Sequence, residues 1–357
     1  MEQSLFDLVK KFEIKGKVVE INPFGNGHIN KTYHVITDEE EYILQQINNY
    51  AFKDVEALMN NIEMVTLYIK KKGYESLDII NTPDKKSYIS AGTEYYRLFK
   101  YVKNSRSYES LDGDMSRAEK LGKAFGQFHL ALSDLNPKFI TETIPDFHNT
   151  PKRFLDFSSA YVASNVQKRA EAYHESEYIL AHGKTYDKIT RGIKRHEIRV
   201  HITHNDPKIN NILFDNETNE VRCVVDLDTV MPGSVLYDIG DSFRSLFTGQ
   251  YEDSRDTTLQ RVNFDIFRHY MKAYLQEMKD YLTKTEIELI PYSIYIMTIE
   301  VAMRFLEDYF NGNVYFHVDY PEHNLIRCRT QIALAEDVLK NQDKLLKIVK
   351  DIIEELK

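Results

Sequence analysis

The first hundred residues alternate apolar and polar positions in short runs, a pattern typical of half-buried β-strands. One longer run, Phe52–Lys72, instead repeats its apolar residues every three or four positions, as an amphipathic helix does. We therefore predict a small antiparallel sheet with one helix. The predicted strands are Lys17–Ile21, Lys31–Val35, Glu41–Ile47, Ser87–Ile89 and Tyr95–Tyr101.

Beyond Asn104 the apolar residues follow helical spacing over long stretches. A first helix is predicted at Ser116–Leu135, with Ser116 and Glu119 as a capping box. Further helices are predicted at Pro151–Gly183 (as one helix or a broken one), Thr257–Tyr281, Thr285–Phe310 and Glu322–Leu356. The change of pattern falls in the polar segment Val102–Asp112. It predicts a β-rich domain at residues 1–103 and a helical domain at 104–357.

A second group of strand-like runs interrupts the helical part. The runs are Ile198–Ile202, Ile212–Phe214 and Val221–Val225, with a turn expected at Asp215–Asn219. The polar residues between them form an H-x-D-x-x-x-x-N pattern of His204, Asp206 and Asn211, and Asp226 follows the last run. A plain β-hairpin whose polar residues cap its turns is the alternative explanation.

The spacing of these polar residues matches the needs of phosphoryl transfer. Protein kinases place a base Asp and a metal-binding Asn at this spacing, and a second metal-binding Asp after the next hairpin. The reaction requires a carboxylate for the acceptor hydroxyl and oxygen ligands for divalent ions on the phosphates. Asp206 fits the first role, and Asn211 and Asp226 fit the second.

A glycine-containing segment, residues 23–30, lies between the first two predicted strands. Gly25, Asn26 and Gly27 would let backbone N–H groups approach a phosphate closely. A hairpin with an Asn-Gly turn is the alternative. No G-x-x-x-x-G-K-[ST] pattern occurs, so a Walker-type nucleotide site is not expected.

The third predicted strand lacks the lysine that protein kinases carry there. Its sequence is YILQQ, and Gln45 occupies the lysine position. Glutamine can hydrogen-bond a phosphate oxygen but adds no positive charge, so metal and backbone, or a cation from elsewhere, would have to hold the phosphates. Glu56 and Glu63 on the following helix are both candidates for the glutamate that usually pairs with that lysine.

Composition narrows the function classes. With 42% hydrophobic and 28% charged residues, a soluble globular protein is expected rather than a disordered one. The net charge of −9 argues against non-specific binding to nucleic acid or anionic membranes. Only Cys223 and Cys328 occur, so neither a disulfide framework nor a cysteine zinc site is expected, and a cytoplasmic location fits. No signal peptide or uncharged apolar run long enough to span a bilayer is recognisable.

Two longer segments resemble a known family. HNDPKINNILFD and VVDLDTVMPGSVLYDIGDSFR are similar to the aminoglycoside phosphotransferase and choline kinase superfamily, whose members have a kinase-like fold and phosphorylate small molecules. Within it, FGNGHINKTYHV, YILQQIN, IPDFHNTPKRF and RFLEDYFNGNVYF resemble the group of N-acetylhexosamine 1-kinases. The similarity spans roughly Val18 to Thr330. That group also has glutamine at the lysine position.

The resemblance implies an α+β, protein-kinase-like fold with two lobes, and ATP and Mg²⁺ as cofactors. It implies that Asp206 is the catalytic base and contacts the acceptor, and that Asn211 and Asp226 are Mg²⁺ ligands. Residues implied at the nucleotide are Gly25, Asn26, Gly27, Gln45, Phe99 and Tyr101. Asp238 would brace the catalytic loop.

Arg304 would contact the sugar by the same resemblance. A plain alternative exists, because Arg304 lies four residues from both Glu300 and Asp308 and could form surface i,i+4 ion pairs. For His148 and Asn149, too, a role in the site and a plain structural role are both open. A helix cap before Pro151 explains Asn149 adequately.

Three hypotheses remain open from the sequence. The first is a kinase of a sugar hydroxyl, with the anomeric hydroxyl of an N-acetylhexosamine favoured. The second changes the acceptor to an amino alcohol, an aminoglycoside or another sugar; a cationic acceptor would call for an extra carboxylate such as Asp228. The third is a nucleotide-binding pseudoenzyme that acts as a scaffold, which the substitution at Gln45 motivates. The sequence leaves the oligomeric state open.

Overall fold

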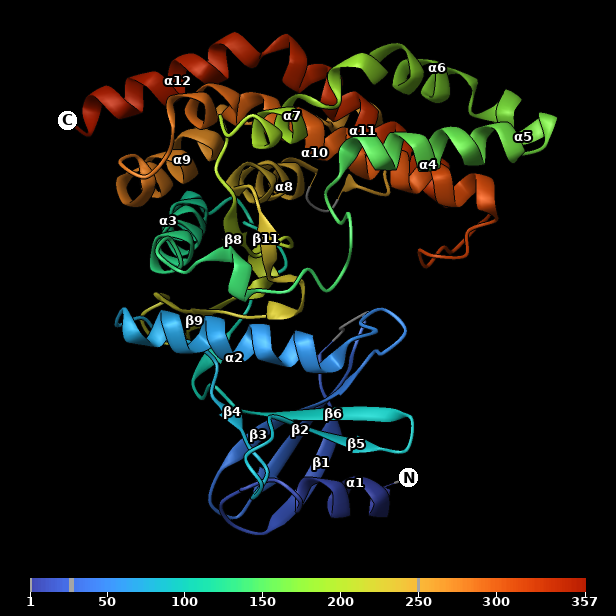
Figure 1. Cartoon of the computed structure of the whole chain (residues 1–357). Helices are drawn as coiled ribbons and strands as arrows, with labels where there is room; N and C mark the ends of the chain where they lie inside the picture. The colour runs from blue at the N-terminus through green and yellow to red at the C-terminus, as the bar shows by residue number, and fades with distance from the viewer. Residues whose placement is uncertain (1, 26–28, 249–250) are drawn as a thin grey trace. The chain divides into compact units, whose positions relative to one another are not determined.

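The computed structural model describes residues 2–25, 29–248 and 251–357 (Figure 1). Asn26 and Gly27, expected at the nucleotide, lie outside the described residues. The chain forms two compact units. Unit 1 comprises Met1–Ser107, Asp134–Pro145 and Ile212–Pro232, and unit 2 comprises Tyr108–Ser133, Asp146–Asn211 and Gly233–Lys357. Residues 1–103 lie within unit 1, which also takes in two later segments of the chain.

Unit 1 contains an antiparallel sheet whose strand order is β1-β2-β3-β6-β4, with β5 paired to β6. Its strands are β1 (Val18–Pro23), β2 (Lys31–Thr37), β3 (Glu41–Ile47), β4 (Ile79–Ile80), β5 (Tyr88–Ala91) and β6 (Glu94–Lys100). All five predicted strands are present, with shifts of one or two residues at most ends. The two-residue β4 was not predicted, because so short a strand carries no alternation.

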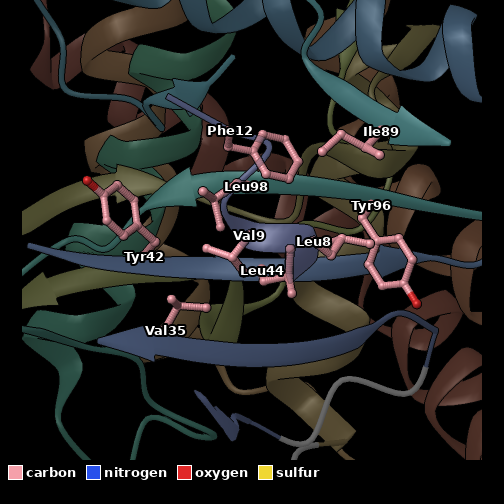
Figure 2. Packing of buried hydrophobic residues seen from close by; sticks show 9 residues of the cluster. All are labelled: Leu8, Val9, Phe12, Val35, Tyr42, Leu44, Ile89, Tyr96 and Leu98. Carbon is pink, nitrogen blue, oxygen red and sulfur yellow. The ribbon is translucent and has the colours of Figure 1, made fainter. Parts of the chain in front are cut away.

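The core of this sheet includes a helix that the sequence pattern did not predict. Helix α1 (Glu2–Val9) ends with Leu8 and Val9, which pack with Phe12 against buried strand residues. Figure 2 shows these three side chains beside Leu44 and Leu98. Helix α1 has only eight residues, too few for helical spacing to be distinctive.

Helix α2 (Val55–Lys71) follows the third strand and is capped by Asp54, whose side chain accepts a hydrogen bond from Ala57 N. Its start therefore lies three residues later than predicted. Asn61 on α2 donates to the carbonyls of Thr141 and Val230, at 2.8 and 3.3 Å. These bonds tie the later segments of unit 1 to its helix.

The same unit contains a second, three-stranded sheet with the order β10-β9-β7. Its strands are β7 (Ser105–Arg106), β9 (Ile212–Asp215) and β10 (Val221–Val224), followed by the 3-10 turn η4 (Leu227–Thr229) and by β11 (Met231–Gly233). The predicted hairpin is thus confirmed. Asp215 closes its turn by accepting from Glu217 N and Thr218 N.

Unit 2 is mainly helical. Its helices are α3 (Met115–Ala131), α4 (Thr150–Ala163), α5 (Val166–Glu171), α6 (Tyr173–His182), α7 (Lys188–Lys194), α8 (Val235–Thr248), α9 (Phe264–Met278), α10 (Lys284–Asn311), α11 (His323–Lys340) and α12 (Gln342–Glu355). The sheets of unit 1 and the helices of unit 2 make a mixed α+β architecture, as predicted.

Several helix boundaries correct the sequence predictions. Asp114, not Ser116, caps α3, because its carboxylate accepts from Ser116 N. The stretch Pro151–Gly183 is broken into three helices, with Asn165 capping the second. The C-terminal stretch is broken once, at Asn341. Strand β8 (His201–Thr203) is shorter than the predicted run, which began at Ile198.

Two glycines allow close packing in unit 2. A Cβ on Gly122 of α3 would lie 2.2 Å from the carbonyl oxygen of Tyr270 on α9, and one on Gly240 of α8 would lie 2.3 Å from Ser293 O on α10. Any larger residue would push these helix pairs apart. Helix α10 is long and apolar enough to cross a membrane, but 83% of its most apolar window is buried inside the protein, as in a core helix.

Candidate active site

The loop between β8 and β9 is anchored to helix α8 through Asp238, which is 1% exposed. The backbone N–H groups of His204 and Asn205 donate to its two carboxylate oxygens at 2.7 and 2.8 Å. Asn205 has a φ of +64°, so the chain turns sharply just before Asp206. Asp238 therefore braces this loop, as the sequence led us to expect.

A buried histidine supports Asp238 from helix α3. His129 Nε2 lies 2.8 Å from Asp238 Oδ2, and His129 Nδ1 lies 2.9 Å from the hydroxyl of Tyr274. Burial lowers the pKa of His129, and the nearby Asp238 offsets this only in part. A neutral His129 then donates from Nε2 to the carboxylate and accepts from Tyr274 at Nδ1. Burial also raises the pKa of Tyr274, so the tyrosine keeps the proton that it donates.

His204, the first residue of the motif, has a structural role in unit 2. Its side chain is fully buried, and its ring packs edge-on against Phe125 and Phe128 of α3. Its Nδ1 accepts a bond from Asp206 N at 3.3 Å. The histidine thereby holds the backbone of the residue that carries the carboxylate.

Asp206 and Asn211 lie together, as the motif predicted. Asn211, at the end of the 3-10 turn η3 (Ile209–Asn211), donates from Nδ2 to the Asp206 carbonyl at 2.8 Å and to its Oδ2 at 3.1 Å. Because Nδ2 is used in this way, the amide oxygen is the atom of Asn211 that is suited to a metal ion. The carboxylate of Asp206 keeps an orientation set by its own loop.

Lys208 is a residue of this loop that the sequence analysis missed. Its Nζ lies 2.8 Å from Asp206 Oδ1. The Asp206 carboxylate raises the pKa of Lys208, so the side chain remains an ammonium ion. The only available signal was its place two residues after Asp206, which by itself is weak.

Helix α8 holds the far side of the same loop. Ser242 donates to the carbonyl of Pro207 at 2.9 Å, and Tyr270 donates to Ser242 at 3.1 Å. On the same helix, Asp241 and Arg244 lie one turn apart and form a buried ion pair of 2.6 Å. Burial would raise the pKa of Asp241, but Arg244 and Lys208 together hold it below its usual value. The charge at Asp241 therefore persists beside Lys208.

Asp226, the remaining metal-ligand candidate, belongs to unit 1. It follows β10 with a φ of +58°, a left-handed conformation that is uncommon for a residue other than glycine. Among the residues that the structure describes, no group of three or more His, Cys, Asp and Glu side chains is arranged to hold a metal ion. Taken singly, the amide oxygen of Asn211 and the carboxylate oxygen of Asp226 are donor types that suit Mg²⁺.

A buried charged cluster in unit 1 surrounds Gln45. Arg97 Nη1 lies 2.6 Å from Asp228 Oδ1, and Asn30 donates to Asp228 Oδ2. Arg97 also donates to Gln45 Oε1 through two nitrogens. Asp228 is therefore engaged on both oxygens and is not a free carboxylate for a cationic acceptor. Arg97 was missed, although a charged residue in the apolar strand Tyr95–Tyr101 was a detectable signal.

The two glutamates considered for an ion pair with the third strand have no such role in unit 1. Glu56 and Glu63 are both exposed on α2. The carboxylate that does meet a cation beside the third strand is Asp228, which comes from η4 rather than from a helix.

Three of the residues expected at the nucleotide, Phe99, Tyr101 and Gly25, differ in how they are packed within unit 1. Phe99 is 5% exposed, and the Arg97 guanidinium carbon lies 5.1 Å from its ring centre. Tyr101 lies beside His34, with ring centres 4.7 Å apart, and its N–H donates to the carbonyl of Glu41. Gly25 has a φ of +71°, and a Cβ added to it would meet no atom within 4 Å.

Arg304 does not form the i,i+4 ion pairs considered as its alternative role. Glu300 instead accepts from Thr150 and contacts His148 Nδ1, at 2.7 and 2.8 Å. Asp308 accepts from the backbone N–H groups of Val314, Tyr315 and Phe316. The Arg304 guanidinium carbon lies 5.7 to 5.9 Å from the ring centres of Phe147, Tyr315 and Phe316.

His148 and Asn149 have separate tasks in unit 2. Asn149 caps α4 by accepting from Lys152 N, as predicted. His148 lies between Glu300 and the backbone carbonyl of Asn205, at 2.8 and 3.3 Å. It therefore links helix α10 to the residue that precedes Asp206.

Comparison with solved structures shows the same fold. An aminopropanol kinase associated with a microcompartment superposes with a TM-score of 0.64 at 12% identity, covering 97% of this chain and 98% of that one. A spectinomycin phosphotransferase in complex with ADP and spectinomycin gives 0.57 at 14% identity, covering 99% and 98%. The ethanolamine kinase of Plasmodium vivax gives 0.59 at 14% identity, covering 91% and 84%.

A sequence family matches the greater part of the chain. Residues 20–274 match the family described as "Phosphotransferase enzyme family". The match includes most of β1, the loop with Asp206 and Asn211, the Asp226 segment and helix α8. The chain therefore belongs to the phosphotransferase enzyme family.

Proposed function

We propose that this protein is an ATP- and Mg²⁺-dependent kinase that transfers the γ-phosphoryl group to a sugar hydroxyl, and specifically to the anomeric hydroxyl of an N-acetylhexosamine. The observation that carries the proposal is the loop in which Asp206 lies within hydrogen-bond distance of both Asn211 and Lys208. A small-molecule kinase needs a carboxylate that is oriented by its own loop and flanked by groups able to meet phosphate charge.

In this reaction Asp206 accepts a hydrogen bond from the acceptor hydroxyl and takes its proton as the new O–P bond forms. The bond between the γ-phosphorus and the bridging oxygen breaks, and ADP leaves. Lys208 offsets negative charge on the transferred group, because its ammonium lies beside the base. Mg²⁺, when bound, neutralises phosphate charge, and Asn211 and Asp226 supply oxygen ligands suited to it.

The nucleotide is assigned to the loop and strands of unit 1. Gly25, with open space around it, suits a close approach of backbone to phosphate. Gln45, Phe99 and Tyr101 lie on or directly after neighbouring strands of the same sheet. The ADP bound by the spectinomycin phosphotransferase supports a nucleotide as the phosphoryl donor here.

The surroundings of Arg304 favour a neutral acceptor. A fixed cation repels an ammonium group, whereas it can donate hydrogen bonds to hydroxyl and acetamide oxygens. Its three aromatic neighbours can cover the apolar face of a sugar ring. The engagement of Asp228 by Arg97 and Asn30 also removes the carboxylate considered for a cationic substrate.

A second candidate is a kinase of an amino alcohol or aminoglycoside. The three similar structures favour this acceptor class, because their names refer to aminopropanol, spectinomycin and ethanolamine. A nucleotide-binding scaffold without activity is less well supported, because Asp206, Asn211 and Asp226 are all retained.

A coupled assay for ADP release tests the proposal. Purified protein with ATP and Mg²⁺ is offered N-acetylglucosamine, N-acetylgalactosamine, galactose, choline, ethanolamine and spectinomycin in turn. We expect turnover with an N-acetylhexosamine and a product phosphorylated at the anomeric position, identified by ³¹P NMR. Turnover with only the amine-containing acceptors would replace the sugar assignment, and ATP binding without turnover on any acceptor would favour the scaffold.

A further inference from the structure

The strand beside Gln45 supplies a positive charge that the third strand itself lacks. In the antiparallel pairing of β3 with β6, Gln45 lies opposite Arg97. Arg97 is 2% exposed, and a cation buried to that extent is stable only when it is paired and hydrogen-bonded. Its guanidinium contacts Gln45, Met59 and Asp228, which all belong to unit 1.

Arg97 determines which way the Gln45 amide points. Its Nε and Nη2 donate to Gln45 Oε1 at 3.0 and 2.8 Å, and a guanidinium can only donate. Gln45 Nε2 must therefore face away from Arg97, and it donates to Thr32 Oγ1 at 3.2 Å. Thr32 is the second residue of β2, directly after the glycine-containing loop. The amide NH₂ of the half-buried Gln45 is thus directed toward the start of β2, away from Arg97.

Arg97 also holds the segment that carries Asp226. Its Nη1 lies 2.6 Å from Oδ1 of Asp228, two residues beyond Asp226. The second oxygen of Asp228 accepts from Asn30 Nδ2, at 2.6 Å, and Asn30 Oδ1 in turn accepts from Asn48 N. Asn30 is the last residue of the loop segment 23–30. One buried pair therefore connects the end of this loop, the third strand and the turn after Asp226.

We propose that Arg97, paired with Asp228, is a positioning residue for the phosphates of the nucleotide, in place of the lysine and glutamate pair that protein kinases use. It would act through Gln45, whose oriented NH₂ group would donate to a phosphate oxygen, and through the segment of Asp226, whose carboxylate would supply an oxygen ligand for Mg²⁺. The inference rests on the proposed function for its nucleotide, but it makes no assumption about the acceptor.

Binding of a non-hydrolysable ATP analogue, measured by calorimetry with and without Mg²⁺, tests this role without turnover. Arg97→Met and Asp228→Asn each leave one buried partner unpaired, so both should lower the melting temperature. The double variant removes both charges and should recover much of that loss. Its affinity for the analogue should nevertheless remain roughly ten- to a hundredfold weaker than that of the wild type, since Gln45 is no longer oriented.

The variant Gln45→Glu separates the loss of the side-chain N–H donor from any loss of folding stability. A carboxylate can accept from Arg97 as the amide does, so the variant should fold with a melting temperature near that of the wild type. It has no N–H to donate, so its affinity for the analogue should also fall at least about tenfold. Arg222→Met is the matched control, because Arg222 forms a comparable pair with Glu75 at the surface of the same unit. It should bind the analogue within about twofold of the wild type.

Wild-type affinity in Gln45→Glu, or in a folded double variant, would overturn the proposal and leave the cluster a purely structural role. A wild-type protein that binds the analogue but phosphorylates no sugar would overturn the acceptor assignment alone, and the loss of affinity in the variants would still support Arg97. A wild-type protein that binds no analogue would overturn both proposals.

Discussion

Asp206 is oriented by contacts that all come from nearby residues or from helix α8. Asn211 and Lys208 contact its carboxylate, His204 holds its backbone, and Asp238 anchors the two residues before it. Replacing the carboxylate by an amide keeps the size of the side chain and removes only its capacity to accept a proton. The residue is therefore suited to a substitution that separates chemistry from folding.

We expect Asp206→Asn to lower kcat by roughly 10²–10⁴-fold, the range for loss of a general base. Affinity for the nucleotide should change little, because Asp206 is assigned to the acceptor, and the single amide oxygen can still accept from one of its two donors, Lys208 or Asn211. Steady-state kinetics with the acceptor identified by the assay above, together with calorimetry for the nucleotide, measure both quantities. Asp280→Asn, at an exposed carboxylate of unit 2, is the control and should retain full activity. Near-native turnover in Asp206→Asn would exclude it as the base.

At the scale of elements, helix α10 brings three charged residues with different tasks to one face, four positions apart. Glu300 bonds to the start of α4, and Asp308 accepts from the backbone of the segment that follows the helix. Arg304, which lies between them on the helix, has its guanidinium beside three aromatic rings. The spacing alone suggested a surface ion-pair series, and the packing of α10 rules that out.

Arg304→Ala should therefore raise KM for the acceptor and leave KM for ATP nearly unaltered. Loss of one charged hydrogen bond to a neutral sugar costs about 1.5–3 kcal/mol, or roughly ten- to a hundredfold in apparent affinity. Arg191→Ala is a matched control on α7, where the arginine forms an exposed pair with Asp187. It should change KM by less than about fivefold. An equally small effect in Arg304→Ala would remove the residue from the acceptor site.

At the scale of the whole molecule, stability should depend on pH through His129. Burial lowers its pKa in the folded protein below the ordinary value of 6.5, so the unfolded chain binds its proton first as the pH falls. The stabilising contribution of neutral His129 is complete above pH 6.5. It is lost as the pH falls below that value toward the folded pKa. One proton limits the slope to about 1.4 kcal/mol per pH unit.

Urea denaturation of the wild type and of His129→Gln between pH 7.5 and 5.5 checks this expectation. Glutamine can still donate to Asp238 but does not titrate. The variant should be less stable at pH 7.5, because it packs less well beside Tyr274, yet its free energy of unfolding should fall less steeply toward pH 5.5. Parallel slopes for the two proteins would assign the pH dependence to other groups.

The sequence by itself determined those features that depend on neighbours along the chain. Alternation identified β2, β3 and β6, because successive side chains of a strand point to opposite faces. The spacing of Asp206 and Asn211 identified their loop, since both residues lie within one turn and its short 3-10 helix. Helix breaks at Ser164 and Asn341 were harder to place, because apolar spacing continues across them and only the local caps reveal the ends.

Only the tertiary structure determined which residues far apart in the sequence contact the charged side chains. The strand pairing of β3 with β6 brings Arg97 to Gln45, 52 positions away, and Asn30 reaches Asp228 across 198 positions. Nothing in the local pattern distinguishes Asp228 from a free acidic residue, or Arg304 from a member of an ion-pair series. A buried charge must find a partner wherever the fold places one, and that choice depends on packing rather than on spacing along the chain.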